Sequence, residues 1–365
     1  MSDKTQHDGG AASPVSRINQ QFIADHLGVS RTTVSRCFTN HAGISPVTRA
    51  RVFDLASQLG YRHMEMRAPR KSRAPVAATV GVLICTDVDQ CLSSGYESPS
   101  VELYSGLSEF AQLNKFKLDL SYVSPTERSL DDASYAKLGP LQKRGWDGVI
   151  LIYPFPRSVV EEIAMRFPVV SMNEQFGVEG INCVDVDHYA GIWMMMDRLR
   201  ELGHARIGFY TRRYAVEAEW SLRRFGAYMQ KLVRLRMPVL PGDIVNNYPG
   251  SIFASRDEEL DYIAARIADG VTAWVCAADH QAYDLIAGLE KRGIRVPRDV
   301  SVTGFDGIRK PDWAPLLTTV SVPFWEMGYT AGRRLHDMIK KRFGSPQHVL
   351  VAPGMREGET TGPIH

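Results

Sequence analysis

Arg31, Thr32 and Thr33 are the side chains whose placement first suggests a chemistry, the reading of base edges in duplex DNA. They follow Ser30, a residue type favoured as a helix N-cap, and so open a predicted helix. When such a helix enters the major groove, its N-terminal residues face the bases, and arginine and threonine form hydrogen bonds there. The alternative is an ordinary helical hairpin whose Arg/Thr face is solvated.

The elements that must hold these side chains form a predicted helix-turn-helix over residues 20–39. Ala24 is small enough for the second helix to cross close to the first. Gly28 stands at the turn, where a left-handed backbone costs glycine less than other residues. Apolar residues recur at spacings that face one shared core: Ile23, Leu27, Val29 and Val34.

A third predicted helix completes a small all-α domain. Ser45 is placed as its N-cap and Pro46 as its first residue, and Gly60 is expected to end it. Between them runs an apolar stripe formed by Val52, Leu55, Ala56 and Leu59. We assign residues 18–62 to this domain and expect the polar segment 1–17 to be a disordered tail.

Positive charge is concentrated in the same part of the chain. Residues 17–73 contain ten lysines and arginines and three acids, a net charge of +7, whereas the whole 365-residue chain has +2. A basic head on a mildly acidic body fits binding of a polyanion at one end. The segment 63–78 is basic and contains Pro69 and Pro75, so we interpret it as a hinge or linker, either a solvated tether or a segment that itself touches DNA.

The remainder of the chain alternates short apolar runs with helical patterns, which indicates an α/β fold. Strands are expected at 79–85, 116–123, 147–153, 168–172, 205–210, 273–277 and 300–303, and helices at 100–113, 136–144, 221–235 and 256–269. This alternation is typical of parallel sheets covered on both faces, and its two successive runs predict two subdomains. The default ligand site lies in a cleft between them, beyond the carboxyl ends of the strands.

Other classes of protein are excluded by what the sequence lacks. No apolar run approaches the ~18–20 residues of a membrane span, and the first residues lack the apolar core of a signal peptide. No nucleophile motif, phosphate-binding loop or metal-ligand spacing is present, so we expect no enzyme activity, no metal and no cofactor. The cysteines are scattered without a Cys-x-x-Cys pair, which fits a reducing cytoplasm: Cys37, Cys85, Cys91, Cys183 and Cys276.

At this point the chain resembles the lactose-repressor (LacI/GalR) family of transcription regulators over nearly its whole length. In the head, Ile23-Ala24 to Arg36 and Ser45 to Tyr61 match the family pattern. In the body, Gly293-Ile-Arg-Val-Pro-Arg-Asp-Val-Ser-Val-Thr-Gly-Phe-Asp306 is a highly specific match. Two further segments continue the resemblance, 199–207 and 315–328.

The resemblance implies a periplasmic-binding-protein-like core behind the helix-turn-helix head. It places subdomain 1 at about 79–185 and 322–347, and subdomain 2 at about 186–321 and 348–365. It also implies a homodimer whose two heads bind a pseudo-palindromic, double-stranded DNA operator. The chain lacks the leucine-heptad tail that makes some members tetramers, so we expect a dimer.

Site residues are carried over from the family onto matching positions. Arg31, Thr32 and Arg36 would face base edges, and phosphates would be held by Asn19, Ser30, Thr33 and Ser35. Arg223 and Asp306 match the arginine and the aspartate that bind effector in the family. Their chemistry suits this role, because a guanidinium and a carboxylate can bracket the polar groups of a ligand. Further effector positions are Asn173, Tyr248 and Phe324, although core packing explains Asn173 and Phe324 nearly as well.

Two positions depart from the family pattern. Where members usually carry a hinge leucine that wedges into the minor groove, this chain has Arg70 after Pro69, and a proline disfavours a short helix. Either Arg67 and Arg70 enter a narrow A·T-rich minor groove, or Met64 or Met66 supplies the wedge. The second departure is Ala278, where members usually have asparagine, so one polar ligand contact is missing.

These observations predict a sequence-specific DNA-binding regulator, which we expect to be a repressor controlled by a small molecule. A sugar or sugar acid suits Arg223, Asp306 and Asn173, and a purine is the alternative because Tyr248 and Phe324 offer aromatic rings. Two rival classes share parts of the chain. One is a solute-binding protein or ligand-binding module without transcriptional output, and the other is an enzyme fused to a DNA-binding head.

Overall fold

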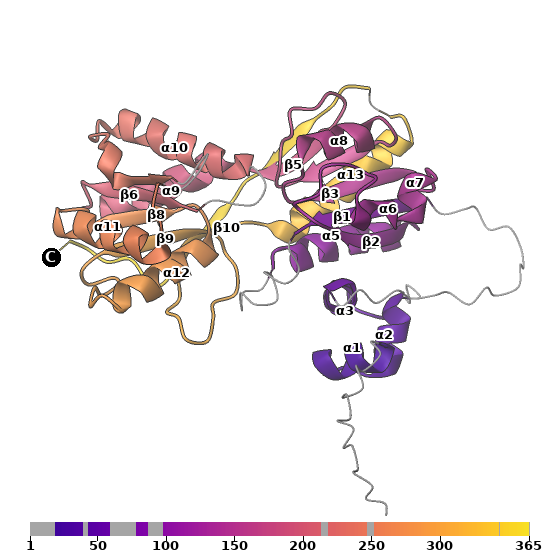
Figure 1. Ribbon diagram of the computed structural model, residues 1–365, viewed down its shortest axis with the longest axis horizontal. Helices are drawn as coiled ribbons and strands as arrows, with labels where there is room; N and C mark the ends of the chain where they lie inside the picture. The colour runs from indigo at the N-terminus through magenta and orange to yellow at the C-terminus, as the bar shows by residue number, and fades with distance from the viewer. Residues whose placement is uncertain are drawn as a thin grey trace, which may run out of the picture.

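A helical head and two α/β subdomains make up the computed structural model (Figure 1), which describes residues 19–38, 43–58, 78–86, 98–212, 218–246, 252–342 and 344–364. The expected tail over 1–17 and nearly all of the linker over 63–78 lie outside the described residues. The predicted fold class, an all-α head followed by two parallel-sheet subdomains, is confirmed.

The head consists of α1 (Gln20–Leu27), α2 (Arg31–Phe38) and α3 (Pro46–Gln58). Gly28 ends α1 with φ 64°, the left-handed conformation that glycine adopts without steric cost. Ser30 caps α2 by accepting a hydrogen bond from the Thr33 amide at 3.0 Å, and Ser45 caps α3 in the same way. The described apolar residues named from the sequence form the core of the head together with the buried thiol of Cys37, whereas Leu59 and Gly60 lie outside the described residues.

Subdomain 1 is a parallel six-stranded sheet in the order β11-β5-β4-β3-β1-β2. Its strands are β1 (Thr79–Cys85), β2 (Lys117–Val123), β3 (Gly148–Ile152), β4 (Val169–Met172), β5 (Asn182–Val186) and β11 (His348–Val351). Successive residues of β1 point to opposite faces, so Val82 packs beneath α5 (Ser100–Leu113) and α13 (Phe324–Ile339). Leu83 packs on the other face with α8 (Arg157–Ala164).

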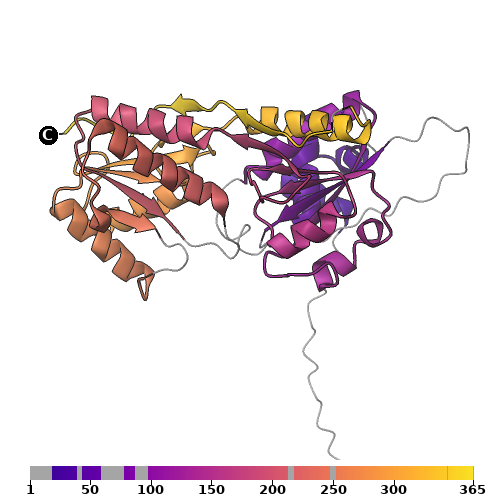
Figure 2. The same ribbon diagram turned by 90° about the horizontal axis from the view of Figure 1, so that it is seen from above.

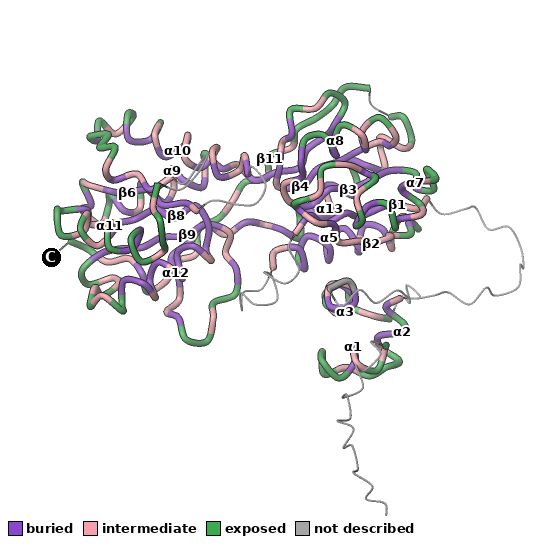
Figure 3. The backbone as a smooth tube through the Cα atoms, viewed as in Figure 1, coloured by how far each residue is buried: buried purple, intermediate pink, exposed green. Residues whose placement is uncertain are grey.

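Subdomain 2 repeats this plan with the order β12-β10-β9-β8-β6-β7. Its strands are β6 (Ile207–Thr211), β7 (Ile244–Asn246), β8 (Ala273–Cys276), β9 (Ser301–Asp306), β10 (Thr318–Ser321) and β12 (Gly354–Arg356). All pairs are parallel except that of β10 with β12. One face is covered by α9 (His188–Glu201) and α10 (Glu219–Leu235), and the other by α11 (Arg256–Ala268) and α12 (Asp279–Glu290). The inner strands of both sheets are buried along most of their length, whereas the edge strands β2, β7, β11 and β12 are largely half-buried or exposed (Figure 3).

The chain crosses between the subdomains three times (Figure 2): from β5 to α9, from β10 to α13, and from β11 to β12. The third crossing differs from the expected one, which placed everything after residue 347 in subdomain 2. Residues 348–351 instead pair with β5 as an edge strand of subdomain 1. The backbone groups of β5 would otherwise remain without a ladder partner on that side, and the late strand supplies one.

The helix expected over 136–144 is divided into two single turns, α6 (Ala133–Ala136) and α7 (Gly139–Gln142). Pro140 lies in the first turn of α7, where its missing N–H is tolerated. The break lies at Leu138, whose φ of -84° and ψ of 86° are not helical. In one continuous helix the Pro140 ring would clash with the carbonyl group of Ala136.

Helices α5 and α13 approach each other closely at two glycines. A Cβ atom on Gly106 would collide with the Trp325 carbonyl oxygen, and one on Gly328 would collide with the Leu103 carbonyl oxygen. Only glycine permits this backbone approach, so the two helices form one layer beneath the sheet of subdomain 1. Among the described helices, none is long and apolar enough to span a membrane.

Candidate functional site

The residues predicted to read DNA lie at the start of α2. Arg31, Thr32 and Arg36 are exposed there, and Thr33 and Ser35 are half-buried. Ser30 lies just before them, and its hydroxyl is 2.9 Å from that of Thr33. The side chains expected to contact bases and phosphates therefore lie exposed or half-buried along α2 and just before it, on the surface of the three-helix head.

Asn19 has a structural role that the sequence argument did not assign. Its side-chain oxygen accepts hydrogen bonds from the backbone amides of Gln21 and Phe22 at 2.9 and 3.0 Å, so it is the N-cap of α1. An asparagine directly before a predicted helix was the feature of the sequence that could have indicated this N-cap. Arg67 and Arg70, the proposed minor-groove residues, lie outside the part of the chain that the structure describes.

A second site lies where β4, β5 and β9 end and the two subdomains meet. We call its ionisable residues the junction cluster: Glu174, Asp185, His188, Glu219, Arg223, Arg224 and Asp306. Glu174 and Asp185 come from subdomain 1, whereas the other members come from subdomain 2. No helix, strand or loop contributes more than three of them, so only the folded chain assembles the cluster.

Arg223 joins the two subdomains directly. From α10 it donates hydrogen bonds to Asp185 at 3.0 Å and to the Gln175 carbonyl at 3.2 Å, both in subdomain 1. It also pairs with Glu219 on its own helix at 2.8 Å and lies 3.7 Å from the Glu174 carboxylate. The predicted effector arginine is therefore already surrounded by carboxylates.

Arg224, the next residue, was not singled out from the sequence and is more deeply buried. Its guanidinium pairs with Asp306 at 3.1 Å and donates to the Ala277 carbonyl. It also stacks 3.6 Å from the centre of the Phe305 ring. Asp306, predicted to contact effector, thus has its charge balanced by Arg224. The adjacent pair Arg223-Arg224 was visible in the sequence, but only the burial of each side chain in the structure distinguishes their roles.

His188 connects the two arginine pairs. Its Nε2 lies 3.1 Å from Asp185, and its Nδ1 faces the Nε–H of Arg224 at 3.2 Å. Because Nδ1 must accept from Arg224, the imidazole is neutral and donates from Nε2 to Asp185. Burial accordingly lowers the pKa of His188. Although burial opposes its charge, Asp185 has a lowered pKa because His188 and Arg223 stabilise the carboxylate.

Glu174 differs from the other acids of the cluster. Its side chain is 1% exposed, and the Arg223 guanidinium lies 3.7 Å from its carboxylate. Burial raises its pKa to about 8, against the attraction of Arg223 and a backbone hydrogen bond from Trp220. A carboxyl group held in this way can offer a proton to a ligand or accept one.

A second carboxyl pair lies deeper, where Asp279 approaches Asp306. Asp279 accepts hydrogen bonds from the Thr319 hydroxyl and from the Ile308 amide, the latter at 2.9 Å. Burial raises the pKa of both acids. The Asp306 charge adds to the rise at Asp279, whereas Arg224 opposes the rise at Asp306. Ala278 is buried beside this pair and offers no polar side chain, as the sequence indicated.

The remaining predicted effector residues are distributed differently. Asn173 lies at the end of β4 with φ 64°, next to Glu174. Phe324 opens α13 and is 5% exposed within the main apolar cluster, which supports its packing interpretation. Tyr248 lies outside the described ranges.

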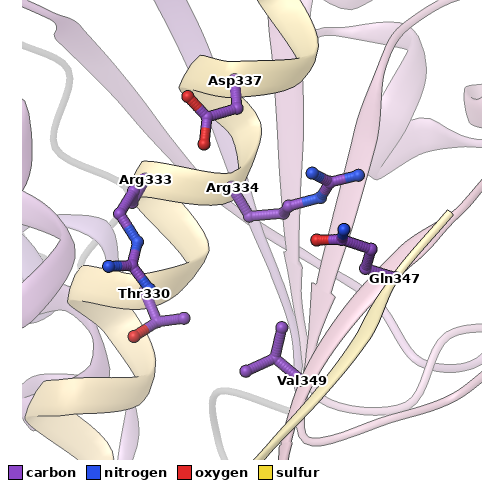
Figure 4. Close-up of a pocket in the computed structure, with 6 residues that line it drawn as sticks. All are labelled: Thr330, Arg333, Arg334, Asp337, Gln347 and Val349. Atoms are coloured by element: carbon purple, nitrogen blue, oxygen red, sulfur yellow. The ribbon is translucent and has the colours of Figure 1, made fainter. Parts of the chain in front are cut away.

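A pocket of about 300 Å³ lies elsewhere, on the outer side of subdomain 1 between α13 and β11 (Figure 4). Some of the polar side chains that line this pocket already form hydrogen bonds or ion pairs within the protein. Arg334 donates to Asn182 at 2.7 Å and to the Ser345 carbonyl, and Asp337 pairs with Arg342. Asn182 also accepts from the Gln347 amide, so these contacts hold the chain that leads into β11.

Comparison with known proteins assigns both parts of the chain. The family model of bacterial regulatory proteins, lacI family, matches residues 21–63, and the model of the periplasmic binding protein-like domain matches residues 196–361. The chain belongs to the lacI family. It is a DNA-binding transcription regulator and not an enzyme, so the rival classes are set aside.

Similar proteins extend over the full length. An HTH-type transcriptional regulator of Mycolicibacterium smegmatis is 27% identical over 372 residues, covering 96% of this chain and 98% of that protein. A solved complex of the regulator CelR with cellobiose has a TM-score of 0.64 at 24% identity, covering 94% of this chain and 100% of that one. The lac repressor dimer bound to operator has a TM-score of 0.60 at 19% identity, covering 94% and 99%. At these identities the structural matches show the fold.

Among the residues that the structure describes, no group of histidine, cysteine and acidic side chains has the arrangement of a metal site. The described cysteines are single and buried, and Cys91 lies outside the described residues.

Proposed function

We propose that this lacI-family protein is a dimeric repressor that reads a pseudo-palindromic operator in the cytoplasm and responds to a neutral, hydroxylated effector of the sugar class. Arg31, Thr32 and Arg36 would read bases, while Ser30, Thr33, Ser35 and Asn19 would lie near phosphates. The exposed start of α2 supports these roles. The complexes of similar fold with cellobiose and with operator support the choice of partners.

The observation that carries the effector class is the charge balance of the junction cluster. Its two arginines are each paired with carboxylates, and acids outnumber them. An anionic ligand would have to displace a carboxylate from Arg223 or Arg224, and it would meet the Asp306 charge with no further cation in the junction cluster. A sugar acid, which the sequence left open, is disfavoured for this reason.

A neutral polyol meets no such penalty. Its hydroxyl groups both donate and accept, so they can donate to Glu174 and Asp306 and accept from Arg223 without removing any charge. Asn173, next to Glu174, would add an amide. Because Arg223 contacts both subdomains, a ligand that binds there changes the contacts between them. Such differential binding is what shifts a two-state equilibrium, typically by ~1–3 kcal/mol.

The test is a thermal-shift series on the purified full chain with ligands that differ in charge and chemical class: glucose, cellobiose, gluconate, glucose 6-phosphate and adenine. We expect a neutral sugar to raise the melting temperature by ligand linkage and the anions to leave it unchanged. Stabilisation by gluconate or glucose 6-phosphate alone would contradict the charge argument, and stabilisation by adenine alone would point to the purine alternative.

Arg223→Ala separates the effector site from the DNA site. The variant should lose the sugar-induced shift and retain binding to DNA, because Arg223 lies in α10, far along the chain from the head. Arg295→Ala is the matched control, since Arg295 is an exposed arginine paired with Asp299 outside the cluster. An unchanged sugar response in Arg223→Ala would refute the assignment.

A further inference from the structure

His188 begins α9, directly after the chain has crossed from β5 of subdomain 1 into subdomain 2. Its imidazole is buried and packs against the ring of Phe305, with the two ring centres 5.8 Å apart. The residue before it, Asp187, caps the helix by accepting a hydrogen bond from the Ala190 amide at 2.9 Å. Backbone and ring are therefore both held in place, which fixes the direction of the two imidazole nitrogens.

A series of four polar contacts runs through this imidazole and reaches the bridge between the subdomains. Asp306 pairs with Arg224 at 3.1 Å, and the Nε–H of Arg224 donates to Nδ1 of His188 at 3.2 Å. Nε2 of His188 donates to Asp185 at 3.1 Å, and Asp185 accepts from Arg223 at 3.0 Å. We call these five residues the imidazole relay.

The imidazole makes the two ends of the relay depend on each other. A neutral ring has one donor and one acceptor nitrogen, so accepting from Arg224 obliges His188 to donate to Asp185. Burial lowers the pKa of His188, against the attraction of Asp185, and so favours this neutral form. Hydrogen bonds joined in a buried series polarise one another, so a change at one end alters the strength of the contact at the other.

Each end of the relay has a place in the proposed function. At one end, Asp306 is a predicted effector contact, and a ligand hydroxyl that donates to it competes with Arg224 for the carboxylate. At the other end, Asp185 of subdomain 1 binds Arg223 of subdomain 2. This contact joins opposite charges and is shorter than the one from Arg223 to the Gln175 carbonyl, 3.0 Å against 3.2 Å.

We propose that His188 is a positioning residue that couples effector contacts at Asp306 to the Arg223–Asp185 bridge between the subdomains. The inference rests on the proposed function and deepens it by naming the residue that transmits binding. A sugar hydroxyl at Asp306 draws that carboxylate away from Arg224, which then donates more strongly to His188. The imidazole becomes a stronger donor to Asp185, so less of the Asp185 charge remains for Arg223. Occupation of the site thus weakens the bridge.

The test measures two quantities in the full chain. One is the affinity for glucose or cellobiose, whichever stabilises the wild type. The other is the ratio of affinities, without and with saturating sugar, for a duplex that the wild type enriches from a random-sequence library. His188→Phe keeps a flat buried ring and removes both hydrogen bonds, whereas His188→Asn keeps an acceptor and a donor. His204→Phe is the control, because His204 is also buried and bonded at both nitrogens, to the Thr272 hydroxyl and the Gly362 carbonyl.

We expect the wild type and His204→Phe to show the same ratio, roughly 5- to 150-fold for a typical allosteric coupling. His188→Phe should still bind the sugar, because His188 acts through Arg224, but its ratio should fall to near one. His188→Asn should recover part of the ratio. An undiminished ratio in His188→Phe would overturn the proposal, and so would a ratio in His188→Asn no larger than that in His188→Phe.

A double-mutant cycle without ligand gives an independent answer. Asp185→Asn and Asp306→Asn, alone and together, are compared by urea unfolding, because residues in one hydrogen-bond network are coupled whereas independent sites are additive. Their effects on the unfolding equilibrium constant should deviate from additivity by roughly two- to tenfold in the wild type and should be additive in His188→Phe. If His188→Phe does not fold, the wild-type cycle decides, and additivity there would contradict the relay. A wild-type chain whose DNA affinity responds to neither sugar would refute the proposed function, while the cycle would still report on the relay.

Discussion

Arginines serve opposite purposes in the head and in the junction cluster. Arg31 and Arg36 are exposed on α2, at positions where a phosphate or a base edge can approach them. Arg223 and Arg224 are paired with carboxylates between the subdomains, and Arg224 is 5% exposed. In the proposed function an exposed guanidinium of α2 reads DNA, whereas Arg224 is a structural connector because Asp306 neutralises its charge. The residue type alone does not separate these two roles, but the burial of the side chain does.

Arg224→Ala is the strongest test of this comparison between the exposed arginines of the head and the buried arginine of the junction cluster. Removing a buried cation leaves Asp306 without its partner, so the free energy of unfolding should fall by roughly 3–5 kcal/mol. Urea unfolding of the full chain measures the change. The control is Arg295→Ala, which removes an exposed ion pair with Asp299 and should leave the free energy of unfolding nearly unchanged. A similar small loss for both variants would show that Arg224 is not a structural connector.

Arg36→Ala tests the other side of the comparison. The variant should keep the stability of the wild type, because Arg36 is exposed, and should lose roughly 1–3 kcal/mol of operator affinity with relaxed preference at one base position. Fluorescence anisotropy with duplexes changed one base pair at a time provides the measurement. An equal loss on every duplex would mean that Arg36 contacts only phosphate.

Glu174→Gln tests whether the carboxyl group of Glu174 in the junction cluster has a raised pKa. The pKa of Glu174 is raised from its ordinary 4.5 to about 8, so below the lower value the acid is neutral in both folded and unfolded chains. As pH rises through this interval the unfolded chain ionises first, and the wild type loses stability. Glutamine avoids that loss. The variant should gain on the order of 1–2 kcal/mol over wild type between about pH 4.5 and pH 8, measured by thermal unfolding across pH.

A constant stability difference between Glu174→Gln and wild type at every pH would contradict the buried, protonated carboxyl. Glu219→Gln is the control, because Glu219 also pairs with Arg223 but is about half exposed. Its stability difference from wild type should change little over the same pH interval.

Ser30→Ala is the smallest expected effect. The lost N-cap of α2 should destabilise the head by about 1 kcal/mol, because the Thr33 amide loses its acceptor. Hydrogen exchange in 31–38 reports the change. Thr32→Ala, on the exposed face beside it, is the control, and equal exchange in both variants would refute the capping role.

Local features of the chain were predictable where neighbours in sequence decide the structure. Gly28 adopts the left-handed turn and Ser30 caps α2, because both roles depend on backbone groups within a few residues. The division of the helix expected at 136–144 was readable from Pro140, but apolar periodicity outweighed that signal in our expectation.

Features that depend on distant parts of the chain were not predictable from pattern. Residues 348–351 join subdomain 1 because β5 offers an open edge, and nothing in their own composition marks this. The roles of Arg224 and Glu174 were not predicted for the same reason, because four separate segments of the chain form their surroundings. The family resemblance supplied Arg223 and Asp306, but it does not describe the carboxylates that surround them here.

The sequence by itself determined the head, the alternation of strands and helices, and the exposed basic start of α2, because helix caps, turns and hydrophobic periodicity act over short distances. Only the tertiary structure decided which charges are available. Desolvation of Glu174, pairing of Arg223 with Asp185 across the junction, and the hydrogen bond between Arg224 and His188 all depend on residues far apart in sequence. Their free energies depend on burial, and burial exists only once the chain has folded.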